Sequence, residues 1–327
     1  MEIGKISNSD LEKLIFKNLN IKRKEVVSSS KVGMDCSIMD FKEDLIVVST
    51  DPITGASQNI GNLAVNISCN DAYCECAEPV GLLMCCLFPK NISKAEIENI
   101  VKDASKAADK LNVDIVGGHT EITDAVSKVV IITSVIAKVS KNNIPKRDEI
   151  KPGDRILVSK YVGIEGTSII AHDDFSNIKN ILTSDEMKLA KSFKNLISVK
   201  TESEIAKKVG VKNLHDITEG GLLGAAWEMA NSSGYGIEIE KNKVPITEVT
   251  KKICNYYKID PLRLISSGSM LFIAEEKNAK SIIESGKVLN LNISDIGKIV
   301  EKGMYLISDK KEKIDEPKPD ELYKVIK

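Results

Sequence analysis

The sequence is poor in the features that mark nucleic-acid-binding and membrane proteins. Aromatic residues make up only 4% of the 327 residues, too few for a base-stacking platform. Lys and Arg number 46 against 47 Asp and Glu, so a net charge of −1 offers no basic excess for phosphate backbones. The longest apolar run, from Val80 to Phe88, is too short to span a bilayer. We therefore expect neither nucleic acid nor a membrane as a partner.

Other absences concern targeting and nucleotide motifs. The start, MEIGKISNSDLEK, has no apolar secretory segment, and an odd number of cysteines, seven, is typical of reduced thiols, so we expect a cytoplasmic protein. No Walker A pattern is present, and no GxGxxG follows a strand. Arginine is scarce, so a phosphorylated ligand would be held mainly by metal ions and backbone N–H groups.

The length predicts two domains, and both halves mix strands with helices, which predicts an α/β fold. The polar segment 141–154 is the expected boundary, giving domains over 1–145 and 146–327. Beyond Asp309 we expect loose structure. Helices are predicted over 9–19, 60–77, 93–111, 165–171, 184–194, 198–209, 222–231 and 247–257. Strands are predicted over 44–50, 82–88, 113–116, 128–139, 155–159, 236–240 and 269–274.

Four aspartates stand out by their context. They are Asp35 in VGMDCS, Asp51 directly after an apolar strand, Asp71 in CNDAYCECAEP, and Asp216 after a short apolar stretch. Ligands of α/β folds bind where strands end. Converging carboxylates repel one another unless a cation neutralises them, and Mg²⁺ is the usual cation where carboxylates meet phosphates.

Asp71 has two interpretations. It continues an apolar helical stripe that begins at Ile60, and a carboxylate on such a stripe is costly to bury unless it is paired or coordinated. Alternatively, the helix ends near Ser68 and Asp71 caps the next turn. The spacing alone favours neither.

Asp216 and Glu219 resemble a capping box before an apolar helix, with Asp216 as the N-cap, and this is the favoured interpretation. The pair Gly220-Gly221 instead suits a phosphate approaching backbone N–H groups.

Gly117-Gly118-His119-Thr120-Glu121 is expected to form a tight turn after a short strand, with a surface histidine as the default interpretation. The cysteine series Cys69, Cys74, Cys76 and Cys85-Cys86 contains no C-x2-C pair. Buried small apolar side chains are therefore favoured over a metal site.

Taken in order, these stretches resemble the superfamily of aminoimidazole ribonucleotide synthetase. The superfamily includes selenophosphate synthetase, thiamine-monophosphate kinase and a hydrogenase maturation protein that dehydrates a carbamoyl group. The segments that carry the resemblance lie between about residues 30 and 305: VGMDCS, STDPITGA, NIGNLAVNISCNDAYCECAEP, DIVGGHTEIT, KPGDRILVSK, GIEGTSIIA, HDITEGGLLGAAWEMA and IDPLRLISSG.

The resemblance implies a two-domain α/β fold whose N-terminal sheets pair in a homodimer barrel, with ATP between the domains. It implies that Asp35, Asp51, Asp71 and Asp216 bind Mg²⁺. As catalytic residues we expect His119 or Glu121, either of which can shuttle a proton. The implied nucleotide contacts are Thr50, Asn70, Gly117, Gly118, His119, Thr120, Glu219 and Gly220.

The general pattern is most similar to the hydrogenase maturation branch. That branch ends in a Pro-Arg-x-Cys tail where this sequence ends YKVIK, and some of its members carry a lysine where Glu121 stands. The glycine-rich N-terminal segment of that branch is replaced by GKISNSDLEK, and the Cys and Lys of selenophosphate synthetase are missing as well.

We expect an ATP- and Mg²⁺-dependent enzyme that phosphorylates an oxygen of an amide, a carboxylate or a similar acceptor. The acceptor would be a small molecule or a protein terminus. The alternatives are a non-catalytic ATP-binding partner in a maturation complex, a selenophosphate-synthetase-like enzyme, a small-molecule kinase and a thiol-rich metal carrier.

Overall fold

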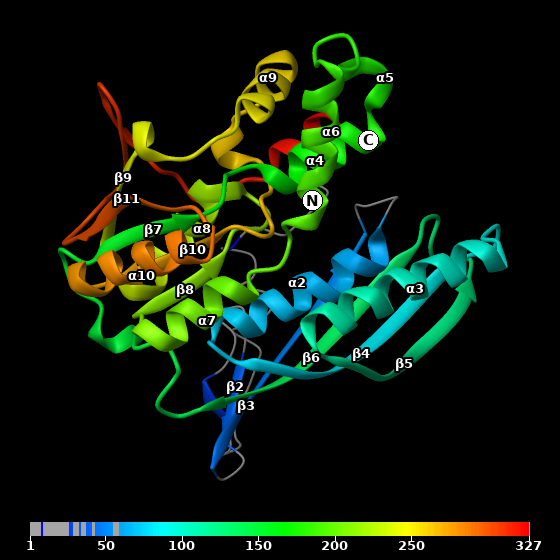
Figure 1. Cartoon of the computed structure of the whole chain (residues 1–327), viewed down its shortest axis with the longest axis horizontal. Helices are drawn as coiled ribbons and strands as arrows, with labels where there is room; N and C mark the ends of the chain where they lie inside the picture. Colours follow the sequence, from blue (N-terminus) through cyan, green and yellow to red (C-terminus); the bar gives the residue numbers. More distant parts are fainter. Residues whose placement is uncertain are drawn as a thin grey trace. The chain divides into compact units, whose positions relative to one another are not determined.

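The computed structural model describes Asn8, 26–28, Gly33, 37–40, 43–54 and 59–326. This part of the chain divides into two compact units that meet in sequence at Ile144-Pro145. The N-terminal unit holds residues 26–28 and 37–144, and the C-terminal unit holds 145–326 with Asn8 and Gly33. Both units mix helices with strands, as expected (Figure 1). Asp35 and the helix predicted over 9–19 lie outside the described residues.

The N-terminal unit is one mixed sheet with two helices on one face (Figure 1). Its strand order is β1-β2-β3-β6-β4-β5, in which only β4 and β5 pair in parallel. The elements are β1 (Val26–Ser28), β2 (Ser37–Asp40), β3 (Asp44–Ile53), α2 (Ile60–Cys74), β4 (Glu78–Pro89), α3 (Lys94–Leu111), β5 (Asp114–Thr123) and β6 (Val130–Ser140).

The two helices differ in how they begin and in what they bury. Helix α3 starts at the predicted capping box. The Ser93 hydroxyl accepts a hydrogen bond from the Glu96 amide, and the Glu96 carboxylate accepts one from the Ser93 amide, which confirms the prediction. Helix α2 is buried nearly all round, although it carries several polar residues, and ends at Cys74, three residues before its predicted end. It packs against β3, β4, β6 and α3, which is why almost every one of its side chains is buried.

Strand β3 continues past the position where Asp51-Pro52 was expected to stop it. It pairs with β6 as far as Ile53, and Pro52 lies opposite Ile132. Among the described residues, the pairing with β2 on the other side covers residues 45–48 of β3. Pro52 therefore interrupts no described hydrogen bond to β2, and the strand tolerates it.

The C-terminal unit contains a seven-stranded sheet in the order β13-β12-β9-β11-β7-β10-β8, in which only β12 and β9 are parallel. The strands are β7 (Arg155–Ser159), β8 (Asn213–Asp216), β9 (Gly236–Glu240), β10 (Met270–Ala274), β11 (Ile293–Val300), β12 (Met304–Ile307) and β13 (Lys311–Lys313). The helices are α4 (Ile164–Asp173), α5 (Phe175–Ile178), α6 (Ser184–Ser192), α7 (Lys200–Val209), α8 (Gly221–Ser233), α9 (Glu248–Tyr257) and α10 (Glu276–Val288).

The last residues of this unit are ordered rather than loose, contrary to expectation. Strand β13 pairs with β12, and a short 3-10 helix, η7, covers Glu321–Lys324. Asp320 and Leu322 are buried, and Leu322 packs into the apolar cluster around α4, α6 and α9. Burial of these side chains fixes the tail although its sequence is charged and contains prolines.

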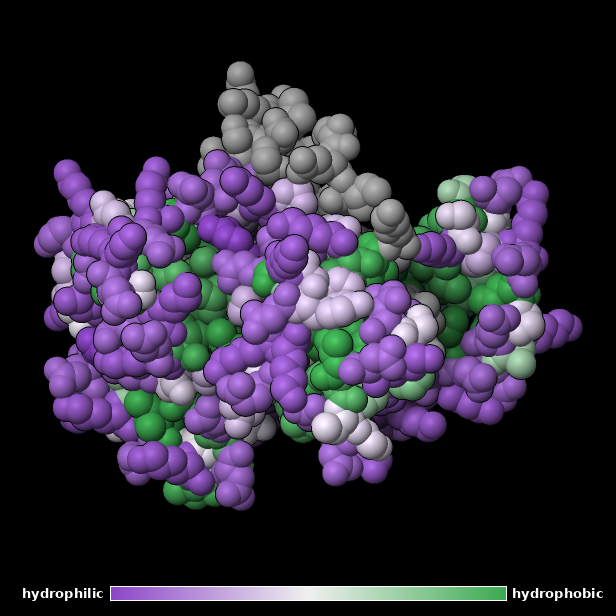
Figure 2. Space-filling view, turned by 90° about the horizontal axis from the view of Figure 1, so that it is seen from above, coloured by the Kyte–Doolittle hydropathy of each residue, from purple (hydrophilic) through white to green (hydrophobic). Residues whose placement is uncertain are grey.

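Charged side chains of both signs cover the described surface. On the face in Figure 2 hydrophilic residues predominate, and apolar residues show only between them. Many of the charged side chains form exposed lysine–carboxylate pairs, such as Lys90–Asp124, and such pairs contribute little to stability. Among the described residues, no helix is long and apolar enough to cross a membrane.

Candidate functional site

Asp71 is buried inside helix α2, one turn before its end. The helix runs on to Cys74, so the apolar-stripe interpretation is confirmed and the interpretation of Asp71 as a cap is wrong. The Ser49 hydroxyl of β3 donates a hydrogen bond to the Asp71 carboxylate. Burying a carboxylate is costly unless it is paired, hydrogen-bonded or coordinated.

Asp51 lies on the same side of the sheet as Asp71. Its partner on β6 is Thr133, which is fully buried and receives a hydrogen bond at its carbonyl from the Ser68 hydroxyl of α2 (3.0 Å). Side chains of directly paired residues point to the same face of a sheet, so Asp51 points to the face that α2 covers. Asn70 is buried beside Asp71 in the helix. Thr50 points to the opposite face, where its hydroxyl accepts a hydrogen bond from Ser134 (2.8 Å).

The segment Gly117–Glu121 is a strand, and the predicted turn is wrong. Strand β5 runs from Asp114 to Thr123 beside β4, and its register shifts between Ile115 and Gly117. Gly118 adopts φ +143°, and a Cβ there would lie 1.9 Å from the Met84 carbonyl oxygen. Close contact between the strands therefore requires a glycine at this position.

His119 and Glu121 lie on the face of the sheet that α2 and α3 leave open. His119 pairs with Cys85, and Nε2 of His119 is 3.8 Å from a carboxylate oxygen of Glu121. Both side chains are more than half exposed. The two predicted catalytic residues are thus brought together, but the sheet separates them from Asp71 within the N-terminal unit. Thr120 is exposed on the same edge strand.

Asp216 is the last residue of β8 and is almost fully buried. It does not cap the next helix: the N-cap of α8 is Gly220, in the left-handed conformation with φ +87°, and no side chain caps it locally. The capping-box interpretation of Asp216 and Glu219 is therefore wrong. The left-handed N-cap, Gly220, lies four residues after Asp216, so α8 starts later than the sequence pattern suggested.

His215 is a functional candidate that sequence reasoning missed. Its Nδ1 donates to the Asp216 carbonyl oxygen (2.6 Å), and its Nε2 lies 3.4 Å from a carboxylate oxygen of Glu228 on α8. Asn8 donates to the other oxygen of Glu228 (3.4 Å). The signal was present in the sequence, since a histidine preceded a singled-out aspartate, but only the fold shows both side chains buried.

The entrance of α8 is occupied by the chain's own carboxylate. The Gly220 amide donates to Asp320 (2.8 Å), and the second oxygen of Asp320 accepts from the Leu322 amide (2.8 Å). Burial raises the pKa of Asp320 to about 7. Glu219 lies close enough to add to this increase, and burial also raises the pKa of Glu165. The Gly220 amide that was predicted to contact a nucleotide therefore donates to an internal carboxyl group in this structure.

The donor chemistry of these aspartates fits a hard cation. Mg²⁺ is bound by one or two carboxylates plus substrate phosphates, and Asp51 and Asp71 provide two carboxylates on one side of the N-terminal sheet. Among the described residues, no group of three His, Cys, Asp or Glu side chains could hold a metal ion by itself. Of the six described cysteines, five are buried and Cys85 is half-buried, as expected for small apolar side chains.

Family comparisons match both units. The model for the N-terminal domain of AIR synthase related proteins matches residues 33–139, and the model for their C-terminal domain matches 151–309.

Three curated relatives cover most of the chain. A putative hydrogenase expression/formation protein of Methanocaldococcus jannaschii is 26% identical, over 86% of this chain and 83% of its own. Carbamoyl dehydratase HypE of Cupriavidus necator is 25% identical, over 82% of this chain and 75% of the relative's own length. Selenide, water dikinase of Caldanaerobacter subterraneus subsp. tengcongensis is 26% identical, over 83% of this chain and 85% of the relative's own length.

Two solved structures share the fold. A structure of hydrogenase maturation protein HypE in complex with ATP has a TM-score of 0.73 at 21% identity and covers 98% of this chain and 97% of its own. A HypE–HypF complex has a TM-score of 0.72 at 24% identity, with 94% and 100% covered. The expected two-domain α/β fold is confirmed.

Proposed function

Because the chain belongs to the AIR synthase related protein family, we propose that it is an ATP- and Mg²⁺-dependent enzyme that activates an oxygen atom by phosphoryl transfer. The acceptor is an amide, a carboxylate or a similar group. Support comes from relatives named carbamoyl dehydratase and selenide, water dikinase, and from a similar structure in complex with ATP. The observation that carries the proposal is Asp71, a carboxylate buried in helix α2 beside Ser49, on the side of the sheet to which Asp51 also points.

In this reaction the acceptor oxygen attacks the γ-phosphorus of ATP, the bond to the bridging oxygen breaks, and ADP leaves. With an amide acceptor, the carbon–oxygen bond then breaks, phosphate leaves and the nitrogen loses two protons, so the net change is dehydration. Bound Mg²⁺ would neutralise the phosphate charge. The protein's own part is to position the reactants and move protons.

The residues are assigned to three tasks. Asp35, Asp51, Asp71 and Asp216 hold the metal, and His119 with Glu121 moves protons. The nucleotide contacts remain those expected from the sequence: Thr50, Asn70, Gly117, Gly118, His119, Thr120, Glu219 and Gly220. For Gly220 this assignment requires Asp320 to release its amide, because the two are hydrogen-bonded now.

The test is ADP formation by the purified protein with Mg²⁺, ATP and a panel of acceptors: amides, carboxylates, selenide and thiamine monophosphate. We expect slow hydrolysis without an acceptor and clear stimulation by one chemical class. A panel that gives no stimulation and no basal hydrolysis contradicts the proposal.

A second candidate function is that of a non-catalytic ATP-binding partner in a maturation complex. The likeness to a HypE structure solved together with HypF favours it. Under this alternative the protein binds Mg–ATP without turnover, whereas the enzyme forms ADP. The two are therefore separated by measuring binding and turnover on the same preparation.

A further inference from the structure

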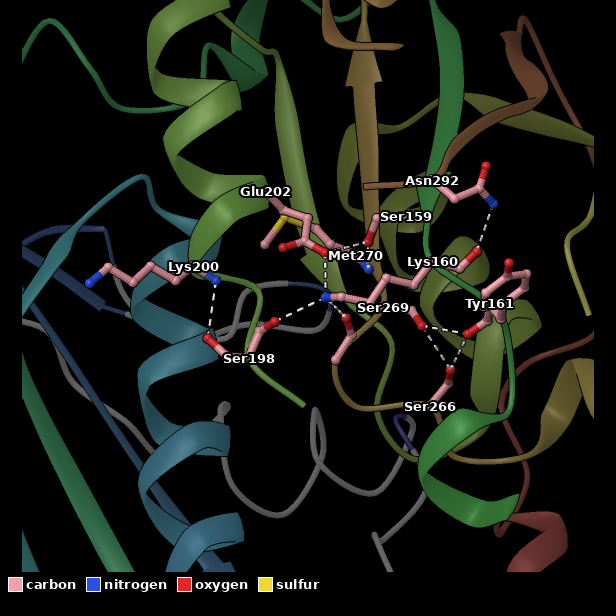
Figure 3. A network of polar contacts seen from close by, with 11 residues as sticks. Ser159, Lys160, Tyr161, Ser198, Lys200, Glu202, Ser266, Ser269, Met270 and Asn292 are labelled. Carbon is pink, nitrogen blue, oxygen red and sulfur yellow. Dashed lines mark hydrogen bonds and ion pairs between the residues drawn. The ribbon is translucent and has the colours of Figure 1, made fainter. Parts of the chain in front are cut away.

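A buried ion pair in the C-terminal unit lies outside every residue assigned above. Lys160 follows β7, and its side chain is 13% exposed, while that of Glu202 in the first turn of α7 is 1% exposed. Figure 3 shows the two side chains meeting in a polar network between α7, β7 and the loop that precedes β10. Burying such charges is costly, so a pair of this kind calls for a specific role.

The Lys160 ammonium uses all three of its donors. It donates to Glu202 (2.5 Å), to the Ser198 carbonyl oxygen (2.9 Å) and to the Gly268 carbonyl oxygen (2.6 Å). The same Glu202 oxygen also accepts from the Ser159 hydroxyl (2.9 Å). One charge thus joins three segments that are distant in sequence.

The Lys160 backbone is also held in an uncommon conformation. Its φ is +52°, in the left-handed region, which is unusual for a residue with a long side chain. Its amide donates to the Asn292 carbonyl oxygen (2.7 Å), and the Asn292 side chain donates back to the Lys160 carbonyl oxygen (3.1 Å). These bonds to the start of β11 fix the direction in which the side chain leaves β7.

The contact with Gly268 is a tight one. Gly268 adopts φ +102°, and a Cβ at this position would lie 2.2 Å from the Leu196 carbonyl oxygen. The loop 266–269 therefore lies directly against the segment that leads into α7. Lys160 bonds a carbonyl oxygen on each side of this contact, at Ser198 and at Gly268.

The loop 266–269 is in turn bonded to the residue after Asp216. The Ile217 amide donates to the Ser269 carbonyl oxygen (3.0 Å), and the Ser266 amide donates to the Ile217 carbonyl oxygen (3.2 Å). Asp216 itself is paired with Met270, the residue that follows the loop. Ser266, Ser267 and Ser269 are fully buried, so the loop transmits a displacement rather than absorbing it.

We propose that Lys160, paired with Glu202, is a positioning residue that holds loop 266–269 and thereby orients the Asp216 carboxylate for a divalent cation. The proposal rests on the proposed function for the metal-binding role of Asp216. Lys160 touches no reacting atom. It acts through the Gly268 carbonyl, the loop and Ile217.

The test needs a variant that removes both charges. Lys160→Met alone would leave Glu202 buried without its counter-ion and could unfold the unit. The double variant Lys160→Met/Glu202→Gln avoids this, and Lys160→Arg keeps the charge. The matched control is Arg155→Met/Asp295→Asn, which removes an ion pair at the opposite end of β7.

Two readouts are made on the full chain, neither of which requires turnover. The first is amide hydrogen exchange of peptides covering Ile217 and Ser266, which should be faster in the double variant and unchanged in the control. The second is Mg²⁺ affinity, measured calorimetrically in the presence of a non-hydrolysable ATP analogue. It should fall about tenfold, the usual effect of losing a partner that orients a metal ligand. Lys160→Arg should retain most of the affinity.

Unchanged Mg²⁺ affinity or unchanged exchange in the folded double variant overturns the proposal. An equal loss in the Arg155→Met/Asp295→Asn control also overturns it, because the effect would then be general destabilisation. A wild-type protein that binds Mg²⁺ and nucleotide but forms no ADP contradicts the proposed function. The positioning role of Lys160 is still decided in that case by amide exchange and Mg²⁺ affinity.

Discussion

The Ser49 hydroxyl donates a hydrogen bond to the Asp71 carboxylate and so joins strand β3 to helix α2. This bond fixes a buried acidic group on the side of the sheet where Asp51 also points. Carboxylate oxygens are the ligands that Mg²⁺ prefers where phosphates are bound. The pair therefore links the packing of the N-terminal unit to the chemistry proposed for it.

Asp71→Asn should weaken Mg²⁺-dependent nucleotide binding at least about tenfold, which corresponds to ~1.4 kcal/mol. The substitution keeps the size of the side chain but removes the negative charge that we propose binds the cation. Calorimetry with a non-hydrolysable ATP analogue measures the effect. Asp109→Asn, on the exposed side of α3, is the matched control and should leave affinity unchanged. Equal affinities for wild type and Asp71→Asn would refute the metal-binding role.

His119→Ala should lower ADP formation roughly 100-fold while changing nucleotide affinity little, because proton transfer matters mainly in the transition state. The His119 side chain is 67% exposed in the single chain, so its loss removes no packing within the N-terminal unit. Steady-state kinetics with the stimulating acceptor gives the answer. Glu98→Ala, which removes an exposed ion pair with Lys102 on α3, serves as the control. A change confined to affinity would remove His119 from the catalytic group.

The open face of the N-terminal sheet leads us to predict a homodimer. Leu83 and Ile136 are about 40% exposed on this face, and a contiguous exposed apolar surface favours association. Ile136→Lys should shift the light-scattering mass toward the monomer at micromolar concentration. Val288→Lys, at an apolar residue that is 81% exposed in the C-terminal unit, should not. A wild-type protein that is monomeric under these conditions contradicts the prediction.

Asp320 should make the protein less stable as the pH rises. Burial raises its pKa from 3.8 to about 7 in the folded state, so between these values the folded chain holds a proton that the unfolded chain has released. Its contribution is present below about pH 4 and is lost as the pH rises through 7. Asp320→Asn removes this titration but leaves Glu165, whose pKa burial also raises.

The measurement is urea unfolding of wild type and Asp320→Asn at about pH 4.5 and about pH 7.5. The free energy of unfolding should fall less over this interval in the variant. If both proteins lose the same amount, Asp320 ionises normally in the folded state.

Local signals predicted the elements that depend on local chemistry. The capping box at Ser93 placed the start of α3, and the bounds of β7 and β9 match the predicted ranges 155–159 and 236–240. The apolar stripe placed Asp71 within α2. Each of these follows from periodicity or capping within one stretch of chain.

Long-range contacts decided the elements that were predicted wrongly. Two glycines suggested a turn at Gly117-Gly118, but pairing with β4 makes this segment an edge strand whose close approach requires glycine at 118. The Asp216-x-x-Glu219 pattern suggested a cap, but the N-cap of α8 is the left-handed Gly220, so the helix begins later. The Gly220 amide donates a hydrogen bond to Asp320, which lies 100 residues away in the sequence. No single window of sequence contains these partners.

The central claim, that this chain transfers phosphoryl groups from ATP, is tested most directly by following ADP formation with Mg²⁺, ATP and the acceptor panel, on wild type and Asp71→Asn side by side. The account predicts slow ADP formation by wild type, stimulation by one acceptor class, and loss of both in the variant. Tight Mg–ATP binding by wild type with no ADP formed under any condition would contradict it and leave the role of an ATP-binding partner.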